Sequence, residues 1–165
     1  MRGLRAIALV AVAAGCAQSD QFSDELEGKS WEVEKAFLPS YPKGENLVPI
    51  YVGRALPFSF FVDRVSVTVG RDGVIRYTLV ARSASEATNV SYEGIRCQTY
   101  EHRVYGFGRS DGTWAQARNS QWIPIGRLSV SPATSLADDL FCSERGRVRT
   151  TDEAQQALAR GNRLR

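Results

Sequence analysis

Four polar residues in one short stretch have the chemistry that an acid–base catalyst needs. Glu93, Arg96, Glu101 and His102 combine two carboxylates, a cation and an imidazole. His102 is the single histidine of the chain, and histidine is the side chain that most readily exchanges a proton near neutral pH. Gathered in one pocket, these residues would suit a small hydrolase in which one of them moves a proton.

The same residues also suit a structural role. Glu93 and Arg96 would form a partly buried ion pair, and ion-pair networks also arise without function. A lone histidine on a strand is usually a packing or surface residue. An active site needs several groups in matched roles, and a zinc site needs more Cys or His ligands at close spacing. We therefore expect no catalytic residue, no metal ligand and no cofactor.

The first of three cysteines closes an export signal. Residues 1–16, MRGLRAIALVAVAAGC, combine a basic start, an apolar run too short to span a bilayer, and small residues before Cys16. The ending AAGC resembles the lipobox of bacterial lipoproteins, in which the cysteine is acylated after cleavage. Acyl chains hold a protein on a membrane without a spanning helix, so Cys16 is the expected lipidation site and the membrane an expected partner.

These features predict the domain organisation. We expect a signal peptide over 1–15, a lipidated N-terminus and tether over 16–29, and a single domain over 30–165. Ala17 stands where aspartate retains lipoproteins in the inner membrane, so we expect an outer-membrane anchor with the domain facing the periplasm. Inner-membrane attachment and a soluble periplasmic protein are the alternatives.

Cys97 and Cys142 are the two remaining cysteines, and the exported compartment is oxidising. They can form one disulfide, which the chain-entropy model values at about 4 kcal/mol for a loop of this length. A catalytic thiol would instead need a basic partner.

The middle of the chain predicts antiparallel strands. Apolar and polar residues alternate over 65–69 and again over 75–81, and the Asp72-Gly73 pair between them is typical of a tight hairpin turn. A second Asp-Gly pair at 111–112 predicts a second turn. Pro49 limits the run 47–53 to an edge strand.

One predicted strand, NVSYEGIRC over 89–97, has apolar residues whose alternation slips by one position. We interpret the slip as a β-bulge at Gly94, which would return Val90, Tyr92, Ile95 and Cys97 to one face.

Two C-terminal segments predict short helices. One follows Ser135 as N-cap, and the other follows Thr150 or Thr151 and stops at Gly161. The expected fold class is α+β, with a mainly antiparallel β-sheet, a bulged meander, and two short C-terminal helices.

The charge balance excludes nucleic acid as the main partner. Two of the 21 basic residues, Arg2 and Arg5, lie in the signal segment, which leaves 19 against 18 acidic residues. A nearly neutral chain lacks the electrostatic footprint of a nucleic-acid-binding protein.

The segments RYTLVARS (76–83), NVSYEGIRC (89–97) and ARNSQW (117–122) resemble the CNP-one-like family of uncharacterised bacterial exported proteins. The likeness runs from about Leu47 to Leu158. It implies a single envelope domain with two paired cysteines and no named activity.

We therefore expect a non-enzymatic interaction or structural module of the bacterial envelope. Its partner would be another envelope protein or the cell-wall polymer. A small periplasmic hydrolase, or a carrier of a small ligand with a sizeable apolar cavity, is the alternative.

Overall fold

The computed structural model of the chain describes residues 37–53, 56–126, 128–143 and 147–163. All of them belong to one compact unit, Glu32–Arg165. The predicted signal peptide, Cys16 and the tether lie outside the described residues.

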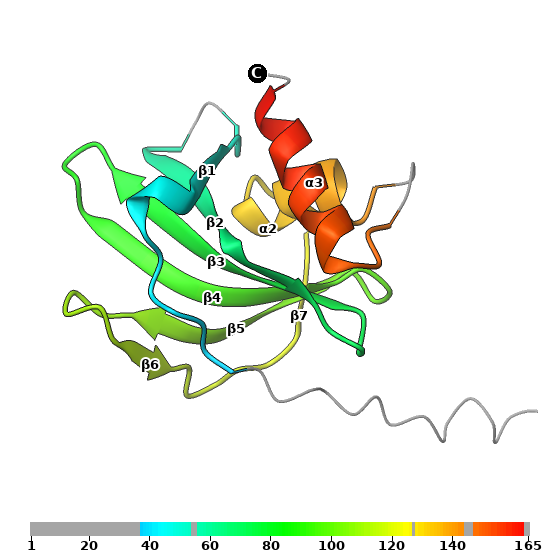
Figure 1. Ribbon diagram of the computed structural model, residues 1–165, viewed down its shortest axis with the longest axis horizontal. Helices are drawn as coiled ribbons and strands as arrows, with labels where there is room; N and C mark the ends of the chain where they lie inside the picture. Colours follow the sequence, from blue (N-terminus) through cyan, green and yellow to red (C-terminus); the bar gives the residue numbers. More distant parts are fainter. Residues whose placement is uncertain (1–36, 54–55, 127, 144–146, 164–165) are drawn as a thin grey trace, which may run out of the picture. The chain divides into compact units, whose positions relative to one another are not determined.

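The described residues form a sheet of seven strands, every pair of which is antiparallel. The strands are β1 (Leu47–Ile50), β2 (Phe58–Val69), β3 (Val74–Ser83), β4 (Thr88–Arg96), β5 (Glu101–Gly108), β6 (Trp114–Gln116) and β7 (Ile123–Pro124). Strands β1 to β6 follow one another across the sheet as a meander, and β7 also pairs with β5 (Figure 1). The predicted α+β fold with a mainly antiparallel sheet is confirmed.

Both predicted Asp-Gly turns join neighbouring strands. Gly73 and Gly112 have φ of 69° and 81°, the left-handed backbone that glycine adopts most readily. The Asp72 side chain accepts a hydrogen bond from the N–H of Val74 at 3.2 Å. The sequence therefore located the β2–β3 and β5–β6 hairpins through their turn chemistry.

The predicted bulge at Gly94 is wrong. The β3–β4 register runs without a break from the Val74–Arg96 pair to the Arg82–Thr88 pair, and Gly94 lies inside it. Gly94 is also absent from the glycines with positive φ. Strand β4 is therefore regular where the sequence predicted an extra residue.

The bulge of this strand pair lies on β5 instead. Tyr92 pairs with Gly106, whereas Glu93 pairs with Val104, so Tyr105 is the extra residue. Bulges bend the bulged strand and re-aim a side chain. The sheet is a bulged meander, but its irregularities lie on β5 and β2 and not on β4.

The alternation slips because β4 is buried on both faces. Ile95 and Cys97 belong to the core beneath the helices. Tyr92 points to the opposite face, where its ring lies 5.7 Å from that of Tyr105 and 6.3 Å from that of Trp114. A strand buried on both sides need not alternate apolar with polar residues.

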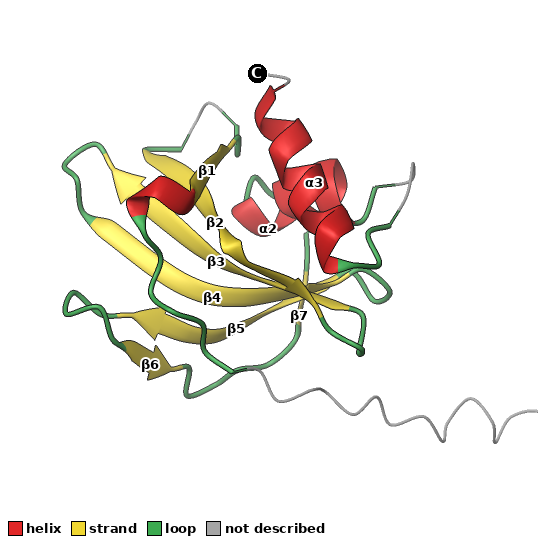
Figure 2. Cartoon of the chain, in the orientation of Figure 1, coloured by secondary structure: helices red, strands yellow, loops and turns green. Residues whose placement is uncertain are grey.

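Three helical segments lie together on one side of the sheet (Figure 2). They are α2 (Pro132–Ser135), the π-helical segment η2 (Leu136–Phe141) and α3 (Thr151–Arg163). We call this side the helix face. Phe141 and Tyr77 are both fully buried there, with ring centroids 6.1 Å apart. Burying a side chain of this size stabilises the fold by about 1.5–3 kcal/mol.

Two predicted helix ends need correction. The first helix begins earlier, because Ser131 and not Ser135 is the N-cap: its side chain accepts the N–H of Thr134 at 3.2 Å. The last helix continues past Gly161 to Arg163. One glycine inside a helix costs only about 1 kcal/mol.

Gly161 has a packing role in α3. A Cβ built on it would lie 2.5 Å from Cδ2 of Leu140 in η2, so a larger residue at this position would require the Leu140 side chain to move. The N-terminal cap was predicted correctly: Thr150 Oγ1 accepts the N–H of Glu153 at 3.2 Å.

The disulfide joins Cys97 to Cys142, as predicted, with the two Cα atoms 5.3 Å apart. Cys97 directly follows β4 and Cys142 directly follows η2. The bond therefore ties the middle of the sheet to the helix face.

The opposite side of the sheet, which we call the second face, is crossed by residues 37–46, the strap. Trp114 Nε1 donates to the carbonyl of Pro39 at 2.9 Å, and the Tyr41 hydroxyl donates to that of Arg109 at 3.0 Å. The strap ends in a 3₁₀ turn, η1 (Gly44–Asn46), and leads into β1 (Figure 1). These contacts anchor the strap at the β5–β6 hairpin.

Candidate functional site

The structure divides the four residues of the predicted polar cluster between the two faces of the sheet. Ile95 of the helix face pairs with His102, and Glu93 is two residues from Ile95, so Glu93 and His102 point to the helix face. Arg96 and Glu101 form the next pair along the same two strands. Each is one residue away from the Ile95–His102 pair, so their side chains point to the second face. The four side chains therefore do not converge on one substrate.

Glu93 is a buried carboxylate held by two hydroxyl groups. Ser91 Oγ donates to Oε1 at 2.6 Å and the Tyr77 hydroxyl donates to Oε2 at 3.1 Å. Burial raises the pKa of Glu93, while the hydrogen bonds from Ser91 and Tyr77 and the nearby His102 lower it in part. Only 9% of Glu93 is exposed, so the carboxylate can hold a proton but is closed to a large substrate.

The predicted Glu93–Arg96 ion pair does not form. Arg96 Nη1 instead lies 3.7 Å from Oε2 of Glu101, and both side chains are partly exposed. A long, partly exposed pair of this kind contributes about 0–1 kcal/mol. Arg96 is therefore only weakly neutralised by its acid.

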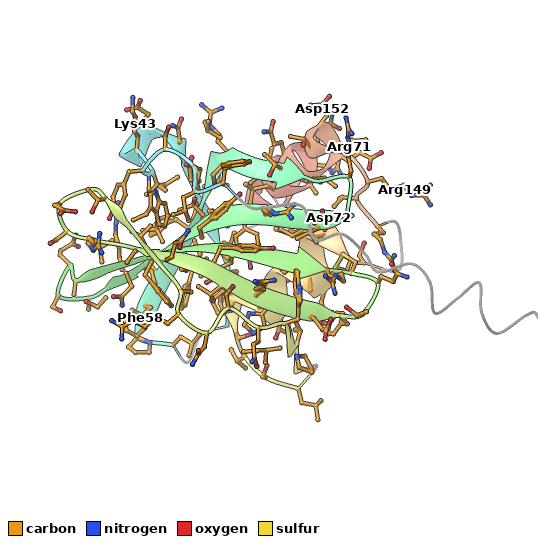
Figure 3. The ribbon with its side chains drawn as sticks, turned by 90° about the horizontal axis from the view of Figure 1, so that it is seen from below. Lys43, Phe58, Arg71, Asp72, Arg149 and Asp152 are labelled. Atoms are coloured by element: carbon orange, nitrogen blue, oxygen red, sulfur yellow. A yellow bond between two sulfur atoms is a disulfide. The ribbon has the colours of Figure 1, made fainter. Side chains whose placement is uncertain are left out.

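The second face carries a different arrangement, in which arginines alternate with aromatic rings. We call it the Arg–aromatic row. In spatial order, its members are Arg76, Tyr105, Arg103, Trp122 and Arg96. Figure 3 views the sheet from below, with Asp72 labelled beside the β2–β3 turn.

The contacts of the row are cation–π contacts. The guanidinium carbon of Arg96 lies 4.1 Å from the centroid of Trp122, and that of Arg103 lies 5.9 Å from the same ring. Arg103 also lies 5.3 Å from the centroid of Tyr105. An arginine over an aromatic face within about 6 Å gains about 0.5–1 kcal/mol at exposed sites.

Strand register positions the row. Gly94 of β4 lies directly between Arg76 of β3 and Arg103 of β5. A Cβ on Gly94 would lie 2.9 Å from Cε2 of Tyr105 and 3.0 Å from Cγ1 of Val74. The Tyr105 ring therefore packs directly against Gly94, between the two arginines. Tyr105 is the extra residue of the β5 bulge.

The arginines of the row differ in how they are neutralised. Arg76 is 5% exposed and is bound by both oxygens of Asp72, at 3.1 and 2.6 Å. Burial works to lower the pKa of Arg76, but its hydrogen bond to Asp72 and the neighbouring charges raise it by more. Arg76 is therefore a structural cation with its counter-ion in place.

Arg103 has no carboxylate within ion-pair distance among the described residues. Its Nε donates to Ser120 Oγ at 2.7 Å, and Ser120 donates to the carbonyl of Val104, which fixes the guanidinium in place. Together with the weakly paired Arg96, it leaves positive charge around the half-buried Trp122.

The described residues supply neither a metal centre nor a membrane-spanning helix. Across these ranges, no three His, Cys, Asp or Glu side chains come together as ligands, and every helix is too short or too polar to cross a bilayer. Cys16 lies outside them, so its lipidation stays a prediction.

Comparison with known proteins identifies the family. The model of the CNP1-like family matches residues 26–159. This chain belongs to the CNP1-like family. It is also 28% identical over 138 residues to cryptic neisserial protein 1 of Neisseria gonorrhoeae (strain ATCC 700825 / FA 1090), covering 70% of this chain and 68% of that protein. No solved structure matches it.

The CNP1-like match spans all seven strands, the disulfide and both faces of the sheet. It begins at residue 26, downstream of Cys16, so the family assignment does not depend on the N-terminal segment.

Sequence reasoning did not assemble the Arg–aromatic row. Its members come from β3, β4, β5 and the segment before β7. One signal in the sequence pointed to the row. Arg76 is a charged residue in a mostly buried strand, and it follows its ion-pair partner Asp72 by four residues. The positions of Arg103 and Trp122 depend on pairing between distant strands.

Proposed function

We propose that this member of the CNP1-like family is a lipoprotein of the bacterial envelope that acts as a non-enzymatic binding module. Its partner is an anionic surface of another envelope protein or of the cell-wall polymer, bound through the Arg–aromatic row. The export signal and lipobox ending at Cys16 support the address, and the Cys97–Cys142 disulfide suits an oxidising compartment.

The observation that carries the proposal is the cation–π contact of both Arg96 and Arg103 with Trp122, with guanidinium carbons 4.1 and 5.9 Å from the ring centroid. A guanidinium presents a planar fork of donors that matches a carboxylate, and stacking on a ring holds that fork in a defined orientation. Arg103 is held further by Ser120. Cell-wall peptides and acidic protein surfaces both present carboxylates, so they are suitable partners for this surface.

The two alternative functions have less support. The hydrolase requires the four polar residues to converge, and they lie on opposite faces. The carrier requires a large apolar cavity, whereas the apolar pocket between β1, η2 and α3 has room for only about 20 Å³ of solvent. That is about one water molecule. The larger clefts, of about 620 and 390 Å³, are lined by charged as well as apolar residues.

The test is binding of the full chain to purified cell-wall polymer by co-sedimentation, and to solubilised envelope extract by crosslinking. Arg103→Lys keeps the charge but loses the fork, and Trp122→Leu removes the ring. Each should weaken binding about tenfold or more, the effect of losing an interface hot spot.

Arg149→Lys is the matched control, because Arg149 is exposed and lies outside the row. Circular dichroism checks that each variant is folded. Absence of binding to both preparations, or equal binding by the row variants and the control, would contradict the proposal.

The anchor has its own test. Mass spectrometry of the mature protein should show an acylated Cys16 as the first residue, and Cys16→Ser should abolish the acylation. Cleavage at another position would contradict the lipoprotein assignment without affecting the row.

A further inference from the structure

A cleft lies on the second face, between the strap and β2. It has a volume of about 390 Å³. Pro39, Tyr41 and Val65 contribute apolar walls, and Asp63 also lines it. Glu45 and Lys43 line the cleft as exposed residues at its rim.

Asp63 is a buried carboxylate, with 4% of the residue exposed. Its Oδ1 accepts the N–H of Val65 at 3.2 Å. Among the described residues, no basic side chain lies within ion-pair distance of it. Burial raises the pKa of Asp63, while the hydrogen bond from Val65 and the charge of Arg64 lower it in part.

The backbone around the cleft is held by its own hydrogen bonds. The β2–β3 register jumps between the Asp63–Thr78 pair and the Thr68–Arg76 pair, which leaves an irregular bulge on β2. Ser66 Oγ bridges it: it accepts the N–H of Thr78 at 2.8 Å and donates to the carbonyl of Asp63 at 2.7 Å. Ser66 therefore satisfies the Asp63 carbonyl and the Thr78 N–H beside the bulge, and Asp63 lines the cleft next to the strap.

We propose that this cleft binds a primary ammonium group carried on a short aliphatic chain. A buried carboxylate is costly unless it is paired with a cation and hydrogen-bonded, and an ammonium group supplies both the charge and the donors. The walls of Pro39, Tyr41 and Val65 accept methylene groups, and Glu45 adds a second negative charge at the rim. A hard divalent cation would need six or more oxygen ligands, and the described residues hold no cluster of three acidic or other metal-ligating side chains.

The experiment is a ¹H–¹⁵N NMR titration of the full chain with n-butylammonium chloride at constant ionic strength. The reporter is the Val65 amide, because it donates directly to Asp63. We expect a saturable shift of this resonance, no such shift with n-butanol, and at least tenfold weaker binding by Asp63→Asn.

Glu45→Gln, at an exposed position, keeps the test decisive if Asp63→Asn does not fold. It should weaken binding several-fold, whereas Glu86→Gln, an exposed acid outside the cleft, should leave it unchanged. Lys43→Gln, which removes a competing ammonium, should bind at least as tightly as the wild type.

Four results would overturn the proposal. They are an equal shift with n-butanol, an unchanged affinity in both Asp63→Asn and Glu45→Gln, a loss of binding in Lys43→Gln, and a Val65 shift with calcium chloride that matches the one with butylammonium. None depends on the Arg–aromatic row, so this inference and the proposed function fail separately.

Discussion

The two faces of the sheet are built from the same strands but differ in chemistry. The helix face is closed by α2, η2 and α3, and its core contains Ile75, Tyr77 and Phe141, all fully buried. The second face carries the Arg–aromatic row and the Asp63 cleft, and the strap crosses only part of it. The main hydrophobic cluster lies on the helix face, and the groups suited to binding lie on the second face.

Strand β4 shows how one segment serves both faces. Glu93 and Ile95 point toward the helices, whereas Tyr92 and Gly94 belong to the second face. Because successive side chains of a strand point to opposite sides, each face can be changed by a substitution that leaves the other intact. Three variants test this separation.

The largest effect is expected on the helix face. Replacing both Cys97 and Cys142 by alanine should lower the free energy of unfolding by about 4 kcal/mol, because the unfolded chain is no longer closed into a long loop. Urea unfolding monitored by circular dichroism measures the change. The wild type in reducing agent should unfold at the same midpoint as the variant, and an unchanged midpoint in both would contradict the prediction.

The second face should be disrupted by Gly94→Ala. The new methyl group would meet the Tyr105 ring at 2.9 Å and Val74 at 3.0 Å, and overpacking of this kind costs about 1–3 kcal/mol. Tyrosine fluorescence should change with the displaced ring. Gly44→Ala is the matched control, because nothing lies within 4 Å of its Cβ position. Equal stability of the two variants would refute the role assigned to Gly94.

The smallest effect is expected from Glu93→Gln, and it should depend on pH. The pKa of Glu93 lies above its ordinary value of 4.5 in the folded state. Its favourable contribution is therefore fully present below pH 4.5 and is lost as the pH rises through the folded-state pKa. The glutamine side chain of the variant has no proton to lose, so the variant should gain stability relative to the wild type as the pH rises, by on the order of 1 kcal/mol.

Thermal unfolding of both proteins between pH 4 and 8 measures that difference. The stability of Glu93→Gln relative to the wild type should increase as the pH rises. Glu86→Gln, at an exposed position, supplies the control and should show no such trend. A stability difference that stays constant with pH would rule out burial of an ionisable Glu93.

Local features of the fold were predictable because they depend on neighbouring residues. Asp72-Gly73 specified its hairpin, and Thr150 specified the start of α3 through one side-chain hydrogen bond. The N-cap at Ser131 was also readable, because Pro132 follows it at the first helical position. The i, i+4 pairs Leu136–Leu140 and Ala137–Phe141 favoured Ser135 as the N-cap instead.

The candidate site was not predictable in the same way. Proximity in the sequence suggested one cluster of Glu93, Arg96, Glu101 and His102, yet alternation along the strands separates them. The Arg–aromatic row joins residues from four segments, and its geometry depends on an extra residue at Tyr105. Beyond a bulge, each side chain points to the face opposite to the one that regular alternation predicts. Misplacing the bulge by one residue therefore assigns the site residues to the wrong faces.

The sequence by itself determined the turns, the antiparallel order of the strands and the two cysteines that pair, since each follows from local backbone preference or from a small number of possible partners. Only the tertiary structure decided which face each residue of β4 and β5 occupies. The physical reason is burial on both sides: alternation identifies the buried face of a strand only when the other face is polar. Here the sheet is covered by helices on one face and by rings, arginines and the strap on the other.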